Sequence, residues 1–419
     1  MSEIIDDNAS TSTAEVAAAA STVEAPSYQN NQSFGQLLRN DLGFLPVLLT
    51  LILIVIFFDI VSHGLFLGPQ NFSNLFGQVV PLGVFAVGIV PVLLLGEIDL
   101  SSAAVGYLCA VIMGVLAERV GWSVGLAIVA ALLVGAIIGA INGFLVAVLR
   151  IPSFIVTLAA FIAYSGLILF LLFGQTTLII DKTFILNLTN GPLSYLTNFW
   201  GVFLPILGVV LYIASLIFNY SRRKKAGLRT ISMGRLIAQS AAVAIVVIAA
   251  LTILQNYNGV PVAVALLFAF IVIEWLGLTK TTAGRHIYAV GGNTEAARRA
   301  GINVTLIRMS VFILCSVMAA VAGILSASRV AAVISGIPQT LQLDIIAAAV
   351  IGGVSLFGGR GSAWAVVLGM LVVECLENGL ALLNQPTDVA QMVEGAVLIL
   401  AVTADALIRR AQARSRSGR

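Results

Sequence analysis

Apolar residues run in long blocks along most of this chain, and short polar stretches separate the blocks. A helix needs about 20 apolar residues to cross the ~30 Å hydrocarbon core of a bilayer. The blocks predict twelve spans, near 44–61, 76–96, 100–118, 123–148, 153–174, 201–219, 236–254, 260–279, 305–328, 341–357, 363–383 and 388–408. The division of 76–118 into two spans is the hardest to place. The pattern therefore predicts an all-α polytopic membrane protein with about twelve transmembrane helices.

Composition strengthens this interpretation. Hydrophobic residues make up 59% of the chain and charged residues only 10%, whereas soluble domains carry about 25% charged residues. Three cysteines, Cys109, Cys315 and Cys375, fall in apolar runs without metal or redox spacing, so we expect small buried hydrophobes and no metal site. No feature suggests a nucleic-acid partner.

The basic residues orient the spans. Cytoplasmic loops of membrane proteins carry an excess of Lys and Arg. If the N-terminus is cytoplasmic and the spans alternate, all of the 22 basic residues except Arg119, Lys182 and Arg329 fall on the cytoplasmic side. The sequence therefore predicts that both termini are cytoplasmic.

Two tails flank the apolar region. Residues 1–40 are rich in Ala, Ser, Thr and Asn, and they lack the basic start and apolar core of a signal peptide. We expect this stretch to be a disordered cytoplasmic tail. The transmembrane domain is predicted at 41–410, and 411–419 forms a basic cytoplasmic tail.

Residues 284–303, GRHIYAVGGNTEAARRAGIN, form a long water-compatible run between two apolar spans. Asn293 can cap a short helix from about Thr294 to Ala300 that has Glu295 in its first turn, and Gly301 can end that helix in a left-handed conformation. Such a helix is ~10 Å long and too short to be stable alone in water. We therefore expect it to dock onto its own chain or onto a second protein.

The stretch 96–102, GEIDLSS, interrupts the apolar region and is called the polar loop below. Asp99 is predicted to be the N-cap of the next helix, and Ser101 can bond to the free amides of that helix. Two interpretations stay open. The loop is either an ordinary turn near the membrane surface or a break, with Glu97 and Asp99, that faces a translocation path.

Other polar residues lie inside the predicted spans, where a charge costs at least ~2.5–3.5 kcal/mol. Candidates for lining a polar cavity are Glu374, Glu377, Asn378, Asn142 and Thr157. Glu374, Glu377 and Asn378 lie within about one turn and share one face or adjacent faces. The glycine-rich stretch 358–362 has no lysine, so it is read as a tight turn and not as a phosphate loop.

Five stretches together resemble the permease subunit of bacterial monosaccharide ABC importers of the ribose, xylose and galactose group. The similarity covers about residues 40–410, and the 284–304 stretch is the most specific. The stretches are GEIDLS (96–101), NGFLVAVLRIPSFIVTLAAF (142–161), GRHIYAVGGNTEAARRAGINV (284–304), AAAVIGGVSLFGGRGS (347–362) and EGAVLILAV (394–402).

The length resembles the xylose type, whose permeases have an extra helix pair, here about 200–255. The plain interpretation of this pair is peripheral packing with its basic loop against anionic lipid, and the alternative is a regulatory role. In one departure, members commonly read DLSVG where Asp99 is followed by LSSAAVG. This departure puts the shape of the path in doubt and not the family.

The resemblance implies a type II-like ABC importer permease fold in the bacterial inner membrane. It implies two permease copies, two ATPase subunits that bind the ATP, and a periplasmic sugar-binding protein, so this chain is expected to be no enzyme and to hold no cofactor. By the resemblance, 284–303 is the coupling segment that docks into the ATPase. The residues expected to make or support this contact are Gly284, Arg285, Asn293, Glu295, Ala296, Ala297, Arg298 and Gly301.

Two other functions remain open from the sequence. An ion-coupled secondary transporter could use Glu97, Asp99, Glu374 or Glu377 to carry protons, but it leaves 284–303 without a role. A membrane anchor for another enzyme would tolerate substitutions in the spans and not in 284–303. The sequence does not decide which sugar an importer of this type would carry.

Overall fold

The computed structural model describes residues 45–400 except 190–192, 197, 229, 231 and 398, together with residue 403. The two predicted tails, 1–40 and 411–419, lie outside the described residues. The chain divides into two compact units, Met1–Gly43 and Phe44–Arg419, and every described element belongs to the second.

Helices dominate this unit, and residues 387–397 are helical as well. The elements in chain order are α3 (Leu45–Val61), α4 (Pro69–Leu94), α5 (Ser102–Gly114), the π-helix η1 (Val115–Arg119), α6 (Val124–Ala147), α7 (Ser153–Leu171), β1 (Thr177–Ile179), α8 (Thr183–Leu186), α9 (Asn198–Lys225), α10 (Met233–Gln255), α11 (Val262–Lys280), α12 (Thr282–Gly292), α13 (Thr294–Arg299), α14 (Val304–Val330), β2 (Ala332–Ile334), α15 (Leu341–Ile351) and α16 (Ala365–Leu382).

The membrane architecture agrees with the apolar blocks. Among the described residues, nine helices are long and apolar enough to cross a bilayer, counting α5 with η1 as one. They coincide with nine of the predicted spans. The blocks at 44–61 and 341–357 hold shorter apolar helices, and 388–408 is only partly described. The polytopic helical fold is confirmed, and the exact number of crossings stays a prediction.

The predicted span at 341–357 needs correction. Its helix, α15, has 11 residues and is therefore about 16 Å long at 1.5 Å per residue. This is about half of what a crossing requires. Gly353, with φ +110°, follows the helix in a conformation that suits glycine, and the chain continues as turns to about 364.

A small sheet also departs from the all-α prediction. Strands β1 and β2 pair antiparallel, with Thr177 opposite Ile334. Each strand has three residues, too few to show an alternating pattern in an apolar sequence. The sheet ties the loop after α7 to the chain that follows α14.

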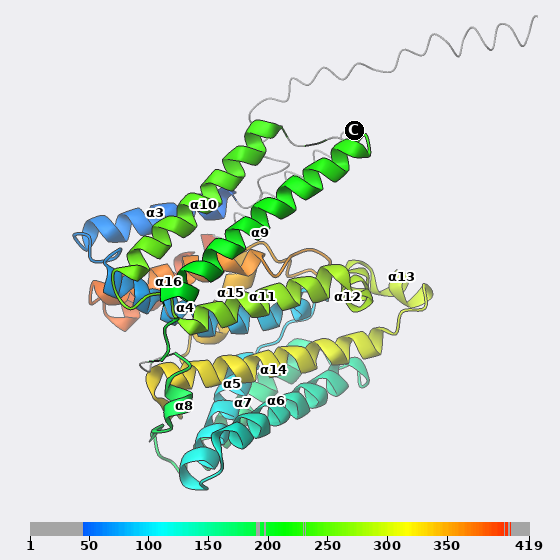
Figure 1. The fold of residues 1–419 in the computed structure, drawn as a ribbon. Helices are drawn as coiled ribbons and strands as arrows, with labels where there is room; N and C mark the ends of the chain where they lie inside the picture. Colours follow the sequence, from blue (N-terminus) through cyan, green and yellow to red (C-terminus); the bar gives the residue numbers. More distant parts are fainter. Residues whose placement is uncertain are drawn as a thin grey trace, which may run out of the picture. The chain divides into compact units, whose positions relative to one another are not determined.

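Helix α14 lies at the centre of the bundle, packed against α4, α5 and α6 (Figure 1). Glycines bring α6 and α14 into backbone contact, and they recur every fourth residue at Gly135, Gly139 and Gly143. A Cβ on Gly139 would lie 2.6 Å from the Cα of Ile313 and from the carbonyl oxygen of Phe312. Small residues allow such close approach in a membrane, where packing drives helix association.

The extra helix pair lies at the periphery of the unit. Helices α9 and α10 contact each other, and α10 contacts α4. Only 6% of the residues in the apolar stretch of α9 and 11% of those in the apolar stretch of α10 are buried. Most of the surface of this pair is therefore available to lipid. Helix α9 ends in four consecutive basic residues, Arg222, Arg223, Lys224 and Lys225.

Candidate functional site

The short helix predicted in the coupling segment is present as α13. The Asn293 side chain accepts a hydrogen bond from the backbone N–H of Ala296 at 2.9 Å, which is an N-cap. Gly301 has φ +85°, and the N–H of Ile302 donates to the carbonyl of Ala297 at 3.1 Å. This pattern is a Schellman C-terminus. Both predicted ends of the helix are therefore confirmed.

The structure separates the predicted contact residues by exposure. Ala297 is buried against the chain itself, and Gly284 is buried in the tight connection from α11 to α12. A Cβ on Gly284 would lie 2.2 Å from the carbonyl oxygen of Leu278. The members that reach the surface are Arg285, Asn293, Glu295, Ala296, Arg298 and Gly301.

Charge on α13 follows the helix dipole. Glu295 lies in the first turn, and Arg298 and Arg299 lie in the last turn, the arrangement that the dipole favours. Arg298 and Glu295 form an exposed ion pair. Exposed pairs contribute little to stability, so these charges remain available to a partner protein. Figure 1 shows α12 and α13 at the ends of the helices that they join, α11 and α14.

Replacing Asn293 with alanine is expected to loosen α13, because an N-cap contributes about 1 kcal/mol and a two-turn helix has little else to hold it. Amide exchange at 296–300 should become about fivefold faster by mass spectrometry. Asn303→Ala is the matched control, since Asn303 caps the 27-residue α14. Unchanged exchange at 296–300 in Asn293→Ala would contradict this role.

The polar loop is exposed at Gly96, where it begins, and its polar residues further along are buried within the bundle. Asp99, Ser101 and Ser102 are 0–1% exposed. One carboxylate oxygen of Asp99 accepts hydrogen bonds from the N–H and the hydroxyl of Ser101, both at 2.7 Å. The predicted N-cap is corrected by this geometry. Ser101, two residues later, is the N-cap of α5, and Asp99 holds that residue in place.

Gln342 of α15 caps the start of α5, where the N-cap residue Ser101 makes no side-chain cap bond of its own. Its side-chain oxygen accepts from the N–H of Ala103 at 2.8 Å and from the Ser102 hydroxyl at 3.2 Å. Its amide nitrogen donates to the carbonyl of Asp99 at 3.1 Å. Gln342 is not among the residues that the sequence predicts to line the path. A polar residue at the start of an apolar block was the available signal.

Two of the predicted path residues join the loop to neighbouring helices. The Asn142 amide of α6 donates to the Ser101 hydroxyl at 3.3 Å. The Thr157 hydroxyl of α7 accepts from the N–H of Leu100 at 2.9 Å. With the Cys315 thiol of α14, which lies 3.6 Å from the second oxygen of Asp99, the loop is bonded to four helices.

Glu97 lies at the edge of this network. Its carboxylate is 3.1 Å from the Arg308 guanidinium of α14, and both side chains are mostly buried. The predicted residues Glu97, Asp99, Ser101, Asn142 and Thr157 therefore lie in one connected group.

Glu374, Glu377 and Asn378 lie apart from that group. The Asn378 amide donates to Gln78 at 3.0 Å, and its oxygen accepts from Asn71 at 2.9 Å, so this residue bonds to α4. Glu374 and Asn378 are buried, whereas Glu377 is exposed. The three residues thus share a face only in part. The predicted path set divides into two groups along the bundle.

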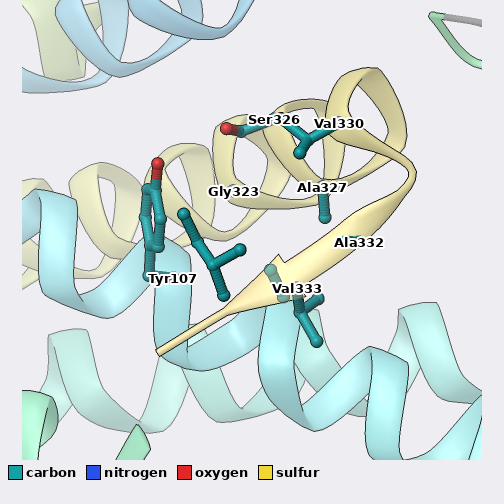
Figure 2. A pocket seen from close by; sticks show the side chains of 9 residues that line it. Tyr107, Gly323, Ser326, Ala327, Val330, Ala332 and Val333 are labelled. Atoms are coloured by element: carbon teal, nitrogen blue, oxygen red, sulfur yellow. The ribbon is translucent and has the colours of Figure 1, made fainter. Parts of the chain in front are cut away.

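A small cavity lies between α5, α14 and β2 (Figure 2). Tyr107 and Ser326 are its polar side chains, and the remaining lining is apolar. Its volume of about 20 Å³ accommodates a single water molecule and no sugar. No group of three or more His, Cys, Asp or Glu residues that could hold a metal ion occurs in the described part of the chain.

Comparison with known proteins identifies the family. A family model described as the permease component of the branched-chain amino acid transport system matches residues 71–402. This chain belongs to that permease family. The permease is accordingly a multi-pass protein of the bacterial inner membrane and is not an enzyme.

Individual relatives are sugar permeases. The permease is 35% identical over 377 residues to the xylose transport system permease protein XylH of Escherichia coli (strain K12), with 90% of this chain and 95% of that protein covered. It is 36% identical to XylH of Haemophilus influenzae, over 86% of this chain and 95% of that one. It is 33% identical to the ribose import permease protein RbsC of Bacillus subtilis (strain 168), over 85% and 91%. No solved structure matches the permease.

Proposed function

We propose that this chain is the permease subunit of an ATP-driven monosaccharide importer of the xylose type. Sugar arrives from a periplasmic binding protein and crosses by alternating access between two permease copies. ATP is bound and hydrolysed by separate ATPase subunits, and this chain holds no cofactor of its own. With the N-terminus in the cytoplasm, the eight predicted spans that precede residue 284 put the coupling segment, 284–303, on the ATPase side.

The observation that carries the proposal is α13, a six-residue helix capped at both ends. A helix this short is stable only when it is held by other structure. Here the buried Ala297 anchors it to the permease, while Glu295, Ala296 and Arg298 face outward. An exposed helix that presents both charges and a small residue suits docking into a cleft of a partner protein.

The polar loop supports the transport path. Irregular backbone at membrane depth is tolerated where protein buries it or where it lines a cavity, and in transporters interrupted helices mark the substrate site. Two interrupted segments meet here. Gln342 bonds to residues 99–103, and Gly96 approaches the backbone of Phe357 and Gly358.

The proposal is tested by ATP-dependent xylose uptake into lipid vesicles that hold the permease, its candidate ATPase and the binding protein. Glu295→Lys is expected to remove most uptake. The substitution breaks the pair with Arg298, and it presents a positive charge to the partner where the wild type presents a negative one. A like-charge contact in an interface costs several kcal/mol, so a loss of tenfold or more is expected.

Glu295→Gln is the matched control, because it keeps the size of the side chain and removes only the charge. It should fall between wild type and Glu295→Lys, and all three proteins should keep the same melting temperature. ATP-independent uptake that Glu295→Lys leaves intact would contradict the importer. If xylose is not taken up but another loaded binding protein stimulates ATP hydrolysis, the mechanism stands and the sugar changes.

A proton-coupled secondary transporter is the second candidate, and the observation that favours it is the burial of Asp99 and Glu374. It predicts uptake that survives removal of the ATPase and collapses with the proton gradient. The importer predicts the reverse in the same vesicles.

A further inference from the structure

The end of α12 packs backbone to backbone against the end of α4, where the turn 355–361 also meets it. The carbonyl of Leu94 accepts a hydrogen bond from the N–H of Gly359 at 2.8 Å. A Cβ on Gly291 would lie 1.7 Å from that same carbonyl oxygen, so only glycine fits. The helix end, the coupling segment and the turn 355–361 therefore meet at Leu94.

A side-chain hydrogen bond also holds α12 to the turn 355–361. The Tyr288 hydroxyl donates to the carbonyl of Gly361 at 2.8 Å. Burial raises the pKa of Tyr288, which keeps the hydroxyl protonated as a donor. The first half of the coupling segment is thus attached to residues 94 and 355–361 without an ion pair.

The second half of the coupling segment reaches the same place by another route. After α13 the chain turns at Asn303 into α14, and Arg308 lies in the second turn of that helix. The Arg308 guanidinium pairs with Glu97 at 3.1 Å, three residues beyond Leu94. Residues 94–97 are therefore held from both ends of the coupling segment.

Of the two attachments, the packing of α12 and the ion pair between Glu97 and Arg308, the ion pair is the one that can rearrange. Its side chains are 24% exposed for Arg308 and 15% for Glu97. The Nε of Arg308 is buried and has no hydrogen-bond partner among the described residues. An unpartnered buried donor is costly, so a second arrangement in which this nitrogen gains a partner would compete with the one seen here.

We propose that Glu97 and Arg308 form a coupling joint that transmits displacement of α13 to the polar loop. Glu97 is the second residue of that loop and Asp99 lies two residues later, so a pull on Arg308 reaches the group bonded to α6, α7, α14 and α15. Glu97 is on this view a positioning residue and no sugar ligand. The joint rests on the proposed function and deepens it.

The test measures two quantities in the reconstituted importer, ATP hydrolysis stimulated by the xylose-loaded binding protein and xylose taken up per ATP. For Glu97→Gln and for Arg308→Gln, stimulated hydrolysis should stay within about twofold of wild type, while xylose per ATP falls about fivefold or more. The exchange Glu97→Arg with Arg308→Glu should restore much of that ratio. Arg119→Gln removes one positive charge from η1 at the far end of α5 and should leave both quantities unchanged.

A different result is expected if the ion pair between Glu97 and Arg308 only stabilises the fold. Hydrolysis, uptake and melting temperature would then fall together, and xylose per ATP would stay constant, which overturns the joint. Failure of the exchange to restore the ratio, with a normal melting temperature, overturns it as well. The wild-type protein separates the two levels. ATP-dependent uptake there sustains the importer whatever the variants do. If no loaded binding protein supports ATP-dependent uptake or stimulates ATP hydrolysis, the importer and the joint are removed together.

Discussion

Replacing Gly139 with leucine is expected to leave no folded permease that can be purified. Any Cβ at this position lies 2.6 Å from backbone atoms of Ile313 and Phe312. Backbone cannot step aside as a flexible side chain can, so α6 and α14 must separate. Overpacking costs about 1–3 kcal/mol and occasionally more, and a clash with backbone at a central interface belongs at the upper end.

The measurement is the monodisperse peak and the melting temperature in detergent. Leucine is a better helix former than glycine, so loss of folding cannot be assigned to helix propensity. Gly125→Leu is the matched control, because Gly125 lies on the same helix with nothing within 4 Å of a Cβ. A Gly139→Leu protein that melts as wild type does would show that the two helices can separate at no cost.

Asp99→Ala is expected to abolish uptake, whereas Asp99→Asn should retain it within a few fold. Alanine leaves the buried N–H and hydroxyl of Ser101 without their acceptor, at about 1–3 kcal/mol for each group. The start of α5 then loses its position. Asparagine keeps an oxygen in the same place, and its amide can donate to the Cys315 sulfur that now lies 3.6 Å away. Uptake and melting temperature are measured together.

This pair of variants also separates the two candidate functions. A proton carrier at Asp99 needs an ionisable side chain, so Asp99→Asn would be as inactive as Asp99→Ala. In the importer the residue acts through hydrogen bonds alone, which the amide can preserve. An inactive but folded Asp99→Asn protein would therefore favour the proton-coupled transporter.

The features that the sequence predicts best are those that depend on residues close together along the chain. Asn293 and Gly301 define the two ends of α13 because caps depend on residues within one turn. The apolar blocks located the long helices because burial in lipid depends on composition over about 20 residues. The half-length of α15 was missed because apolar residues prevail on both sides of Gly352 and Gly353, which mark the interruption.

The hydrogen bonds and the ion pair of the polar loop could not be predicted from the sequence, for a different reason. Gln342 bonds to residues about 240 positions earlier, and Arg308 pairs with Glu97 across more than two hundred residues. Asp99 was recognised as important, yet its role changed from capping α5 itself to holding Ser101. Neither the partner nor the geometry of a buried polar residue follows from local sequence when the partner lies on another helix.

The glycine contacts between α6 and α14 also limit how the permease can change shape. Two helices that meet backbone to backbone have no layer of side chains that could slide or repack between them. If α6 and α14 move during alternating access, they are expected to move together as one stiff unit about 40 Å long, the length of the 27 residues of α14. A small tilt of α14 imposed near Arg308 would then produce a larger sideways displacement at β2, which follows the other end of that helix. The hinges are therefore expected between helices that longer side chains separate.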